Sequence, residues 1–275
     1  MSRRDRRAQE KEERRAQKAQ AKTRLPIAPN APSPPGDKAL VVRRLVRDLV
    51  LHRARGHEGT DHLPLVAAAA AIEAIGPAMA EKFEEEPRPA CKKGCAYCCH
   101  LHVAVTIPEL LLAVGYARET RDAAGLEALA ARAKGAADLA RGTTPLTYPM
   151  PPCAFLGEDG ACTIYPARPL ACRGHHSFDV EACRQVFETK TDRPTPKRET
   201  LVMLGNSAGH GLRDALGELR LDNSSYELNQ ALDVALRDPG AGARWRKGEE
   251  AFSAARATLS VEEARVLGGA EKGEP

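Results

Sequence analysis

Most hydrophobic positions along this chain recur at the spacing of an α-helix. The first run follows Asp37, a residue type favoured at the helix N-cap, and comprises Leu40, Val41, Leu45, Val46 and Leu49. Steps of three and four residues keep side chains on one side of a helix. The pattern therefore predicts that the folded part begins with a helix at Asp37.

The same periodicity predicts several further helices. One runs from about Leu63 through an alanine tract, with a kink expected at Gly76-Pro77. Two antiparallel helices are expected from IPELLLAVGYARET and DAAGLEALAARAKGAADLA. Downstream helices are expected over 200–219, 225–237 and 244–266.

A single stretch favours a hairpin instead: CAFL and ACTIY flank Gly157-Glu158-Asp159-Gly160. No β-α alternation and no internal repeat is visible. The predicted fold class is mainly α: a helical bundle-like body around a cysteine-rich, metal-stapled irregular centre with one short hairpin.

The polar pattern divides the chain into two parts. Residues 1–24 are highly charged without an apolar stripe, and the proline-rich LPIAPNAPSPPG follows. Residues 1–36 are therefore predicted to form a disordered arm and linker. Residues 37–275 are predicted to form one helical domain, with a metal-binding core at 88–190.

Composition supports a helical globular protein. Hydrophobic residues make up 43% and charged residues 28%, whereas aromatic residues reach only 4%. A core of Leu, Val and Ala suits closely packed helices. The net charge of +4 lies in the arm, since residues 1–24 carry +6 and the remainder −2. A body without basic bias disfavours nucleic-acid binding, which would rest on the arm alone.

No membrane segment is expected. MSRRDRRAQEKEERR lacks the apolar region of a secretory signal, and LPLVAAAAAIEAIGPAMA contains Glu73 and Pro77. The protein is therefore predicted to be cytoplasmic, where thiols stay reduced.

The eight cysteines fall into two groups: Cys91, Cys95, Cys98 and Cys99, then Cys153, Cys162, Cys172 and Cys183. Disulfides would require an oxidising compartment or a small coreless domain. Structural thiols would be scattered along helix faces, whereas these cluster among Gly, Pro, Lys and Arg. All eight are therefore predicted to be metal ligands.

The spacing within each group suggests its geometry. In a helix, Cys91, Cys95 and Cys98 would share one face, and Cys99 would point about 100° away. This favours two neighbouring metals or a polynuclear cluster. In the hairpin, with Phe155 facing Cys162, Cys153 would lie diagonally about 7 Å from Cys162, suitable for two ligands of one centre.

Other groups near the cysteines could complete such a centre. Thiolate ligands are anionic, and Lys92, Lys93, Arg168 and Arg173 lie beside them. Imidazoles that could ligate a metal are those of His100, His102, His175 and His176. His176 and Asp179 form the pair that would be tested first for an open catalytic position.

These motifs carry a family resemblance. CKKGCAYCC, followed by CAFLGEDGACTIYPARPLACR, resembles the CxxCxxCC, or YkgJ-like, family of cysteine-cluster proteins, across roughly residues 90–185. The shared elements are the Cys98-Cys99 doublet, Cys153 before Phe155-Leu156, Cys162 before Ile164-Tyr165, and Arg168-Pro169 before Cys172-Arg173. The first spacing departs from the family pattern, with three residues where the family's name has two.

The resemblance implies binding of zinc or iron, with an iron–sulfur cluster among the possibilities. Because some relatives resemble flagellin lysine methylases, an iron–sulfur or iron-dependent enzyme, a protein lysine methylase or one with other S-adenosylmethionine-dependent chemistry, is an alternative. CKKGCAYC also fits the C-x3-C-x2-C spacing of radical S-adenosylmethionine enzymes, but no strand precedes it. A second alternative is a zinc-stapled module that binds nucleic acid or a partner.

Overall fold

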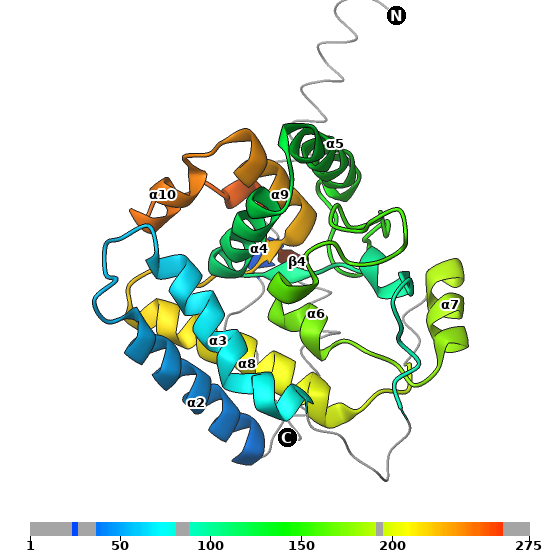
Figure 1. The fold of residues 1–275 in the computed structure, drawn as a ribbon, viewed down its shortest axis with the longest axis horizontal. Coiled ribbons are helices and arrows are strands. Elements are labelled where there is room, and N and C mark those ends of the chain that lie inside the picture. Colours follow the sequence, from blue (N-terminus) through cyan, green and yellow to red (C-terminus); the bar gives the residue numbers. More distant parts are fainter. Residues whose placement is uncertain (1–23, 27–36, 81–87, 191–194, 261–275) are drawn as a thin grey trace, which may run out of the picture.

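The computed structural model describes residues 24–26, 37–80, 88–190 and 195–260, and these residues are mainly helical, as predicted. Helices α2 (Asp37–Ala54), α3 (Leu63–Ala80) and α8 (Glu199–Glu218) pack against one another on one side of the molecule (Figure 1). The rest of the predicted arm, 1–23 and 27–36, lies outside the described residues. Within the arm, Arg24–Pro26 forms a strand.

The close contact between α2 and α8 depends on a glycine. A Cβ atom at Gly211 would lie 2.4 Å from the carbonyl oxygen of Arg43 and 2.9 Å from Val46 Cβ. Beside this contact, Arg43 Nη2 donates to Asp214 Oδ1 at 2.7 Å. A small residue thus lets the two backbones approach, and a part-buried ion pair flanks the approach.

A second set of helices packs around α9 (Leu228–Arg237). Both α4 (Ile107–Glu119) and α5 (Ala123–Ala140) contact α9, which follows them much later in the sequence. The starts of α4 and α5 are set by capping residues within three positions of each helix start. Asp122 caps α5 by accepting from Gly125 N, and Thr106 with Glu109 forms a capping box at α4.

The cysteine-bearing segment consists of short elements: η1 (Tyr97–His100), η2 (Tyr165–Ala167), α6 (Leu170–Gly174) and α7 (Val180–Thr189). Helix α6 contacts α8, whereas α7 stands at the edge opposite α2 and contacts η1 (Figure 1). The α6 contact is again made by glycines, because a Cβ at Gly205 would lie 3.1 Å from Gly174 Cα. The cysteine-bearing segment thus contacts the helical body through the packing of α6 against α8.

Two antiparallel pairs of short strands join distant segments. β1 (Arg24–Pro26) pairs with β4 (Thr258–Ser260), with Leu25 opposite Leu259. β2 (Ala104–Val105) pairs with β3 (Tyr226–Glu227), with Ala104 opposite Glu227. The second pair brings the chain after η1 to the start of α9.

The core is built from small side chains around few large ones. Alanine is abundant among the buried residues, and the largest fully buried side chains include Trp245, Tyr226, Phe155 and Phe252. Phe155 comes from the cysteine-bearing segment, so that segment shares the core of the helical body. Helix α3 is long and apolar enough to cross a membrane by length and composition, but it packs against α2, α4 and α8.

The predicted hairpin is present with a register shifted by one residue. Leu156, not Phe155, pairs with Cys162. The reason is the turn: Gly157 N donates to Ala161 O at 2.8 Å, and Gly160 adopts φ +71°. Three residues therefore span the turn, with the left-handed residue at its end. The prediction that Cys153 and Cys162 share one face of the hairpin is wrong. Cys153 begins a turn, closed by the hydrogen bond from Leu156 N to Cys153 O, that precedes the Leu156–Cys162 pair.

The predicted helix over 244–266 is also wrong. Helix α10 (Ala241–Arg246) stops before Gly248, which has φ +83°, and a short η3 (Ser253–Ala255) follows. Glycine in the left-handed region ends helices. Beyond it, Phe252 and Ala257 are buried and β4 pairs with β1, while 261–266 lies outside the described residues.

Candidate metal centre

The first cysteine group is a turn followed by a 3₁₀ helix, so the α-helix that would have placed Cys91, Cys95 and Cys98 on one face is not formed. Cys95 N donates to Lys92 O at 3.0 Å, and Gly94 has φ +89°, a conformation that interrupts a helix. Only Cys98 and Cys99 lie in η1. The four thiols are therefore placed by a folded loop and not by helical periodicity.

Two glycines hold this loop against the hairpin turn. A Cβ at Gly160 would lie 2.8 Å from the carbonyl oxygen of Gly94, and Lys93 Nζ forms an ion pair with Asp159 Oδ2 at 3.2 Å. Farther along, Cys153 N donates to Cys99 O at 2.7 Å. These contacts bring the two cysteine groups, distant in sequence, into one region.

Three cysteines form what we call the inner group: Cys153, Cys162 and Cys172. Burial, with smaller contributions from the neighbouring thiols of Cys98 and Cys162, raises the pKa of Cys172 to about 12. Burial is likewise the main cause that raises the pKa of Cys153 to about 12, and Cys172 and Cys162 are among the smaller causes included in that value. These mutual effects place the three sulfurs within range of one another's charge.

The outer group consists of Cys91, Cys95 and Cys183. Burial raises the pKa of Cys183, and Cys91, Cys95 and Cys98 add to the effect. Burial also raises the pKa of Cys95, to which Cys91 and Cys98 contribute. Helix α7 thus carries Cys183 back to the first cluster, although it follows Cys172 in sequence.

Cys98 lies between the two groups. A hydrogen bond between the side chains of Cys98 and Cys99, followed by burial, raises the pKa of Cys98, and the charge of Cys98 in turn raises the pKa of thiols in both groups. The Cys98-Cys99 doublet therefore forms the junction. Among the residues that the structure describes, no three His, Cys, Asp or Glu side chains are close enough to hold a single ion.

Arg168 supplies positive charge to the inner group. Burial is the main influence on the thiol of Cys162 and raises its pKa, whereas the Arg168 guanidinium lowers it; the same opposition holds at Cys172. The guanidinium stacks 3.9 Å from the ring centroid of Tyr165. Its buried Nε has no hydrogen-bond partner among the described residues. A buried cationic donor beside thiols suits an anionic thiolate centre.

The other cations predicted to offset thiolate charge differ in role. Arg173 donates from Nε to Arg168 O at 2.9 Å and also contacts Pro166 O, so it braces the loop that carries Arg168. Lys93 pairs with Asp159. Lys92 lowers the pKa of Cys95, against the larger effect of burial.

Backbone amides and a serine hold the outer group. Ser177 N donates to Cys91 Sγ at 3.4 Å, and Ala90 N donates to Ser177 O at 2.8 Å. The Ser177 side chain also lowers the pKa of Cys183, against burial. N–H donation to sulfur stabilises a thiolate. Sequence inspection missed Ser177, which carries no motif of its own.

Glu109 positions Cys172. Its Oε2 accepts from Thr106 N at 2.9 Å and from Thr106 Oγ1 at 2.8 Å, and its Oε1 accepts from Leu170 N at 2.9 Å. The buried carboxylate therefore joins the start of α4 to the start of α6, two residues before Cys172. The Thr-x-x-Glu capping box was the available signal for this residue.

The four candidate histidines are not equivalent. His176 is buried, with Nδ1 3.1 Å from Gly174 O and Nε2 accepting from Arg198 N at 2.7 Å, so both ring nitrogens are engaged. Asp179 caps α7 through Glu181 N and Ala182 N. The pair singled out for catalysis thus has structural contacts. His102 packs edge-on against Tyr148, and burial lowers its pKa to about 4.

His100 and His175 lie nearer the junction. His100 Nδ1 is 3.2 Å from Met150 O, and its ring is 4.6 Å from that of Phe187. His175 lines a cavity of about 140 Å³ between η1 and α7, together with Cys98 and Cys183. This cavity adjoins the candidate centre.

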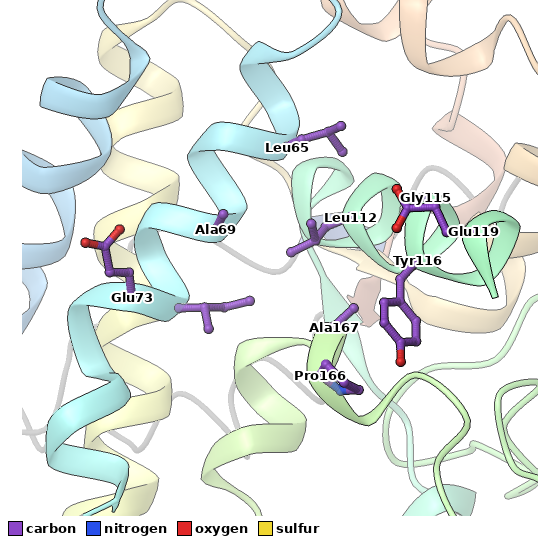
Figure 2. A pocket seen from close by; sticks show the side chains of 10 residues that line it. Leu65, Ala69, Glu73, Leu112, Gly115, Tyr116, Glu119, Pro166 and Ala167 are labelled. Carbon is purple, nitrogen blue, oxygen red and sulfur yellow. The ribbon is translucent and has the colours of Figure 1, made fainter.

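A larger hollow lies elsewhere. It measures about 400 Å³ and is lined by α3, α4 and η2, without cysteine or histidine. Figure 2 shows Leu65 and Ala69 of α3 facing Leu112 and Tyr116 of α4. Its lining is mostly apolar, with the carboxylates of Glu73 and Glu119 but no cysteine, so the smaller cavity is the one relevant to the cysteines.

Residues 90–194 match the family model of the CxxCxxCC family, described as "Putative zinc- or iron-chelating domain". The match covers the inner group, the outer group and the doublet. No curated protein and no solved structure matches the chain.

Proposed function

We propose that this chain, whose residues 90–194 match the model of the CxxCxxCC family, binds zinc or iron through its eight cysteines. The observation that carries the proposal is the environment of Arg168. The buried Nε of Arg168 has no hydrogen-bond partner among the described residues, and its guanidinium lowers the pKa of Cys98, Cys162 and Cys172, so thiolates at these positions would balance its charge. Metal ions keep buried thiols deprotonated.

The sulfur neighbourhoods support two four-thiolate sites. The outer site would combine Cys91, Cys95, Cys98 and Cys183. The inner site would combine Cys153, Cys162 and Cys172 with Cys99, which we assign to it because the Cys99 carbonyl oxygen accepts from Cys153 N and because Cys98, whose charge acts on thiols of both groups, is taken by the outer site. The doublet supplies one ligand to each, which accounts for two adjacent cysteines. Because a metal site is seldom closed before binding, the sulfurs would draw together as the ion enters.

The chain's own residues would then support the ligands. Arg168 offsets charge at the inner site, and Ser177 N donates to Cys91 at the outer site. When bound, zinc would supply structural crosslinks or Lewis acidity, and an iron–sulfur centre would supply electron transfer. Glu109 would keep α6, and with it Cys172, in place.

The experiment is metal analysis of protein purified without oxygen, on the wild type and two single variants. Wild type should contain stoichiometric zinc or iron, and bound iron with sulfide should add absorbance near ~400 nm. Cys172→Ala should lose the inner ion and Cys91→Ala the outer ion, each leaving the other site loaded. Wild-type protein without zinc or iron would overturn the proposal.

The two alternative functions rest on different features of the chain. An iron-dependent enzyme is favoured by one observation, the cavity that reaches Cys98 and Cys183. The nucleic-acid alternative depends on residues 1–24, of which only Arg24 is described. The eight cysteines form no disulfide with one another in the structure, in agreement with the proposed cytoplasmic location, where thiols stay reduced.

A further inference from the structure

The hollow between α3 and α4 is lined by one stripe of residues from each helix, and a glycine keeps it open. The stripes follow helical spacing and consist of Leu65, Ala69 and Ile72 from α3 and Leu112, Gly115, Tyr116 and Glu119 from α4. A Cβ atom at Gly115 would meet nothing within 4 Å beyond its chain neighbours and the backbone of its own helix. Glycine weakens a helix interior relative to alanine, and packing does not require it here. Its effect is therefore to leave the space between the helices empty.

The size and lining of this hollow are those of a small-molecule site. It measures about 400 Å³, within the roughly 300–1,000 Å³ typical of ligand pockets. Pro166 and Ala167 of η2 complete the apolar lining beside the ring of Tyr116 (Figure 2). Ile72 and Tyr116 also pack against the hydrophobic core, which fixes these parts of the wall. An alkyl chain that enters the hollow would therefore leave water for a preformed apolar surface.

The charge available in the hollow comes from one carboxylate. Of the two acidic residues in the lining, Glu73 is already paired, because its Oε1 accepts from Arg53 Nη2 at 2.7 Å. Figure 2 shows the Glu73 carboxylate on the side of α3 away from α4. Glu119 forms no ion pair within the part of the chain that the structure describes, and the described lining contains no Lys, Arg or His. Tyr116 lies three residues before Glu119, and aromatic ring faces attract cations.

We propose that this hollow binds a small alkylammonium ion from solution, with the alkyl chain between α3 and α4 and the ammonium group beside Tyr116 and Glu119. The site is separate from the proposed metal function, since its described lining holds neither Cys nor His. At roughly 30 Å³ per water molecule, the space is that of about 13 waters, which accommodates an octyl chain. A neutral alcohol of equal length should bind more weakly, and a carboxylate more weakly still, because Glu119 repels an anion.

The test is isothermal titration calorimetry of the full chain with four probes: octylammonium, hexylammonium, 1-octanol and octanoate. Octylammonium should bind wild type saturably at one site, and each methylene added after hexylammonium should tighten binding by up to about fourfold. Glu119→Gln should weaken octylammonium binding by about two- to fivefold, the effect of one exposed charge pair, and leave 1-octanol binding unchanged. Wild-type protein that binds octylammonium no better than octanoate would overturn the proposal.

A second pair of variants tests the hollow itself. Gly115→Leu should fill the space and abolish octylammonium binding without lowering the midpoint of urea unfolding, because leucine is a strong helix former. Gly135→Leu is the matched control: this exposed glycine of α5 also has nothing within 4 Å of its Cβ, lies outside the lining, and should leave binding unchanged.

Two further results would contradict the proposal. One is octylammonium binding that Gly115→Leu leaves intact, since the ligand would then bind elsewhere. The other is a wild-type dimer in sedimentation that Gly115→Leu converts to a monomer, since a second copy of the chain would then occupy the hollow.

Discussion

The backbone N–H of Cys153 donates a 2.7 Å hydrogen bond to the carbonyl oxygen of Cys99. This bond joins the first cysteine loop to the start of the second cysteine group. Ala154 N, the next amide, donates to the buried Asn229 Oδ1 at 3.0 Å, so the same segment is fixed to α9. The position of the inner thiols thus depends on the helical body as well as on the loops.

Removal of the charge of Arg168 should shift metal binding to higher pH. The guanidinium lowers the pKa of Cys162 and Cys172 against the raising effect of burial, and metals bind the deprotonated thiols. Arg168→Gln should therefore raise the midpoint pH of Co²⁺ binding at the inner site, by up to about one unit. Arg184→Gln, at an exposed arginine of α7, should leave it unchanged. A midpoint unaffected by Arg168→Gln would contradict the assigned role.

Glu109→Gln should loosen α6. The amide can present only one oxygen, so its NH₂ group must face either Leu170 N or the two donors of Thr106. An unsatisfied buried donor costs about 1–3 kcal/mol in unfolding free energy. Urea denaturation and Co²⁺ titration should show lower stability and weaker inner-site binding. Glu119→Gln, at an exposed position on the same helix, should change neither.

The contact between Gly94 and Gly160 should be intolerant of a methyl group. Gly160 has φ +71°, and its Cβ would lie 2.8 Å from Gly94 O. Gly142 has a similar φ of +75° with nothing within 4 Å, so Gly142→Ala should cost only the left-handed backbone penalty of about 1–2 kcal/mol. Gly160→Ala should cost more and should also weaken outer-site Co²⁺ binding. Equal losses of stability would show that the close approach is unimportant.

Two glycines of α8 should respond to alanine with opposite signs. At Gly211 a Cβ would lie 2.4 Å from Arg43 O, so Gly211→Ala should force α2 and α8 apart and cost about 1–3 kcal/mol or more. At Gly209 the Cβ would meet only Arg213 Nη1, at an ordinary 3.7 Å. Gly209→Ala should therefore stabilise the helix by about 0.5–1 kcal/mol. Thermal or urea unfolding measures both, and a harmless Gly211→Ala would contradict the observed packing.

Stability should fall between about pH 6.5 and pH 4 in part because of His102. Burial lowers its pKa to about 4, so the unfolded chain binds a proton in this range before the folded chain does. Its contribution is complete above the unfolded pKa and is lost as pH falls toward 4, by up to about 3 kcal/mol. His102→Phe should flatten this part of the profile. His52→Gln, at an exposed histidine, should keep the wild-type slope.

The sequence by itself determined the features that depend on neighbouring residues. The helix beginning at Asp37, the start at Leu63 and the helices matching α4, α5 and α8 follow from periodicity and caps, which act within a few residues. The cysteine spacing and the Arg-Pro before Cys172 indicated the family whose model matches residues 90–194. The Thr106–Glu109 capping box was also visible, although its bond to Leu170 was not.

Only the tertiary structure decided which side chains meet. Gly94 turned the first cluster away from an α-helix, a three-residue turn set Leu156 opposite Cys162, and Gly248 ended the last helix early. Cys183 joins Cys91 and Cys95, and Arg168 lies among the inner thiols, through contacts between distant segments. Such pairings depend on backbone approach and burial across the whole fold, and local spacing along the chain carries no information about either.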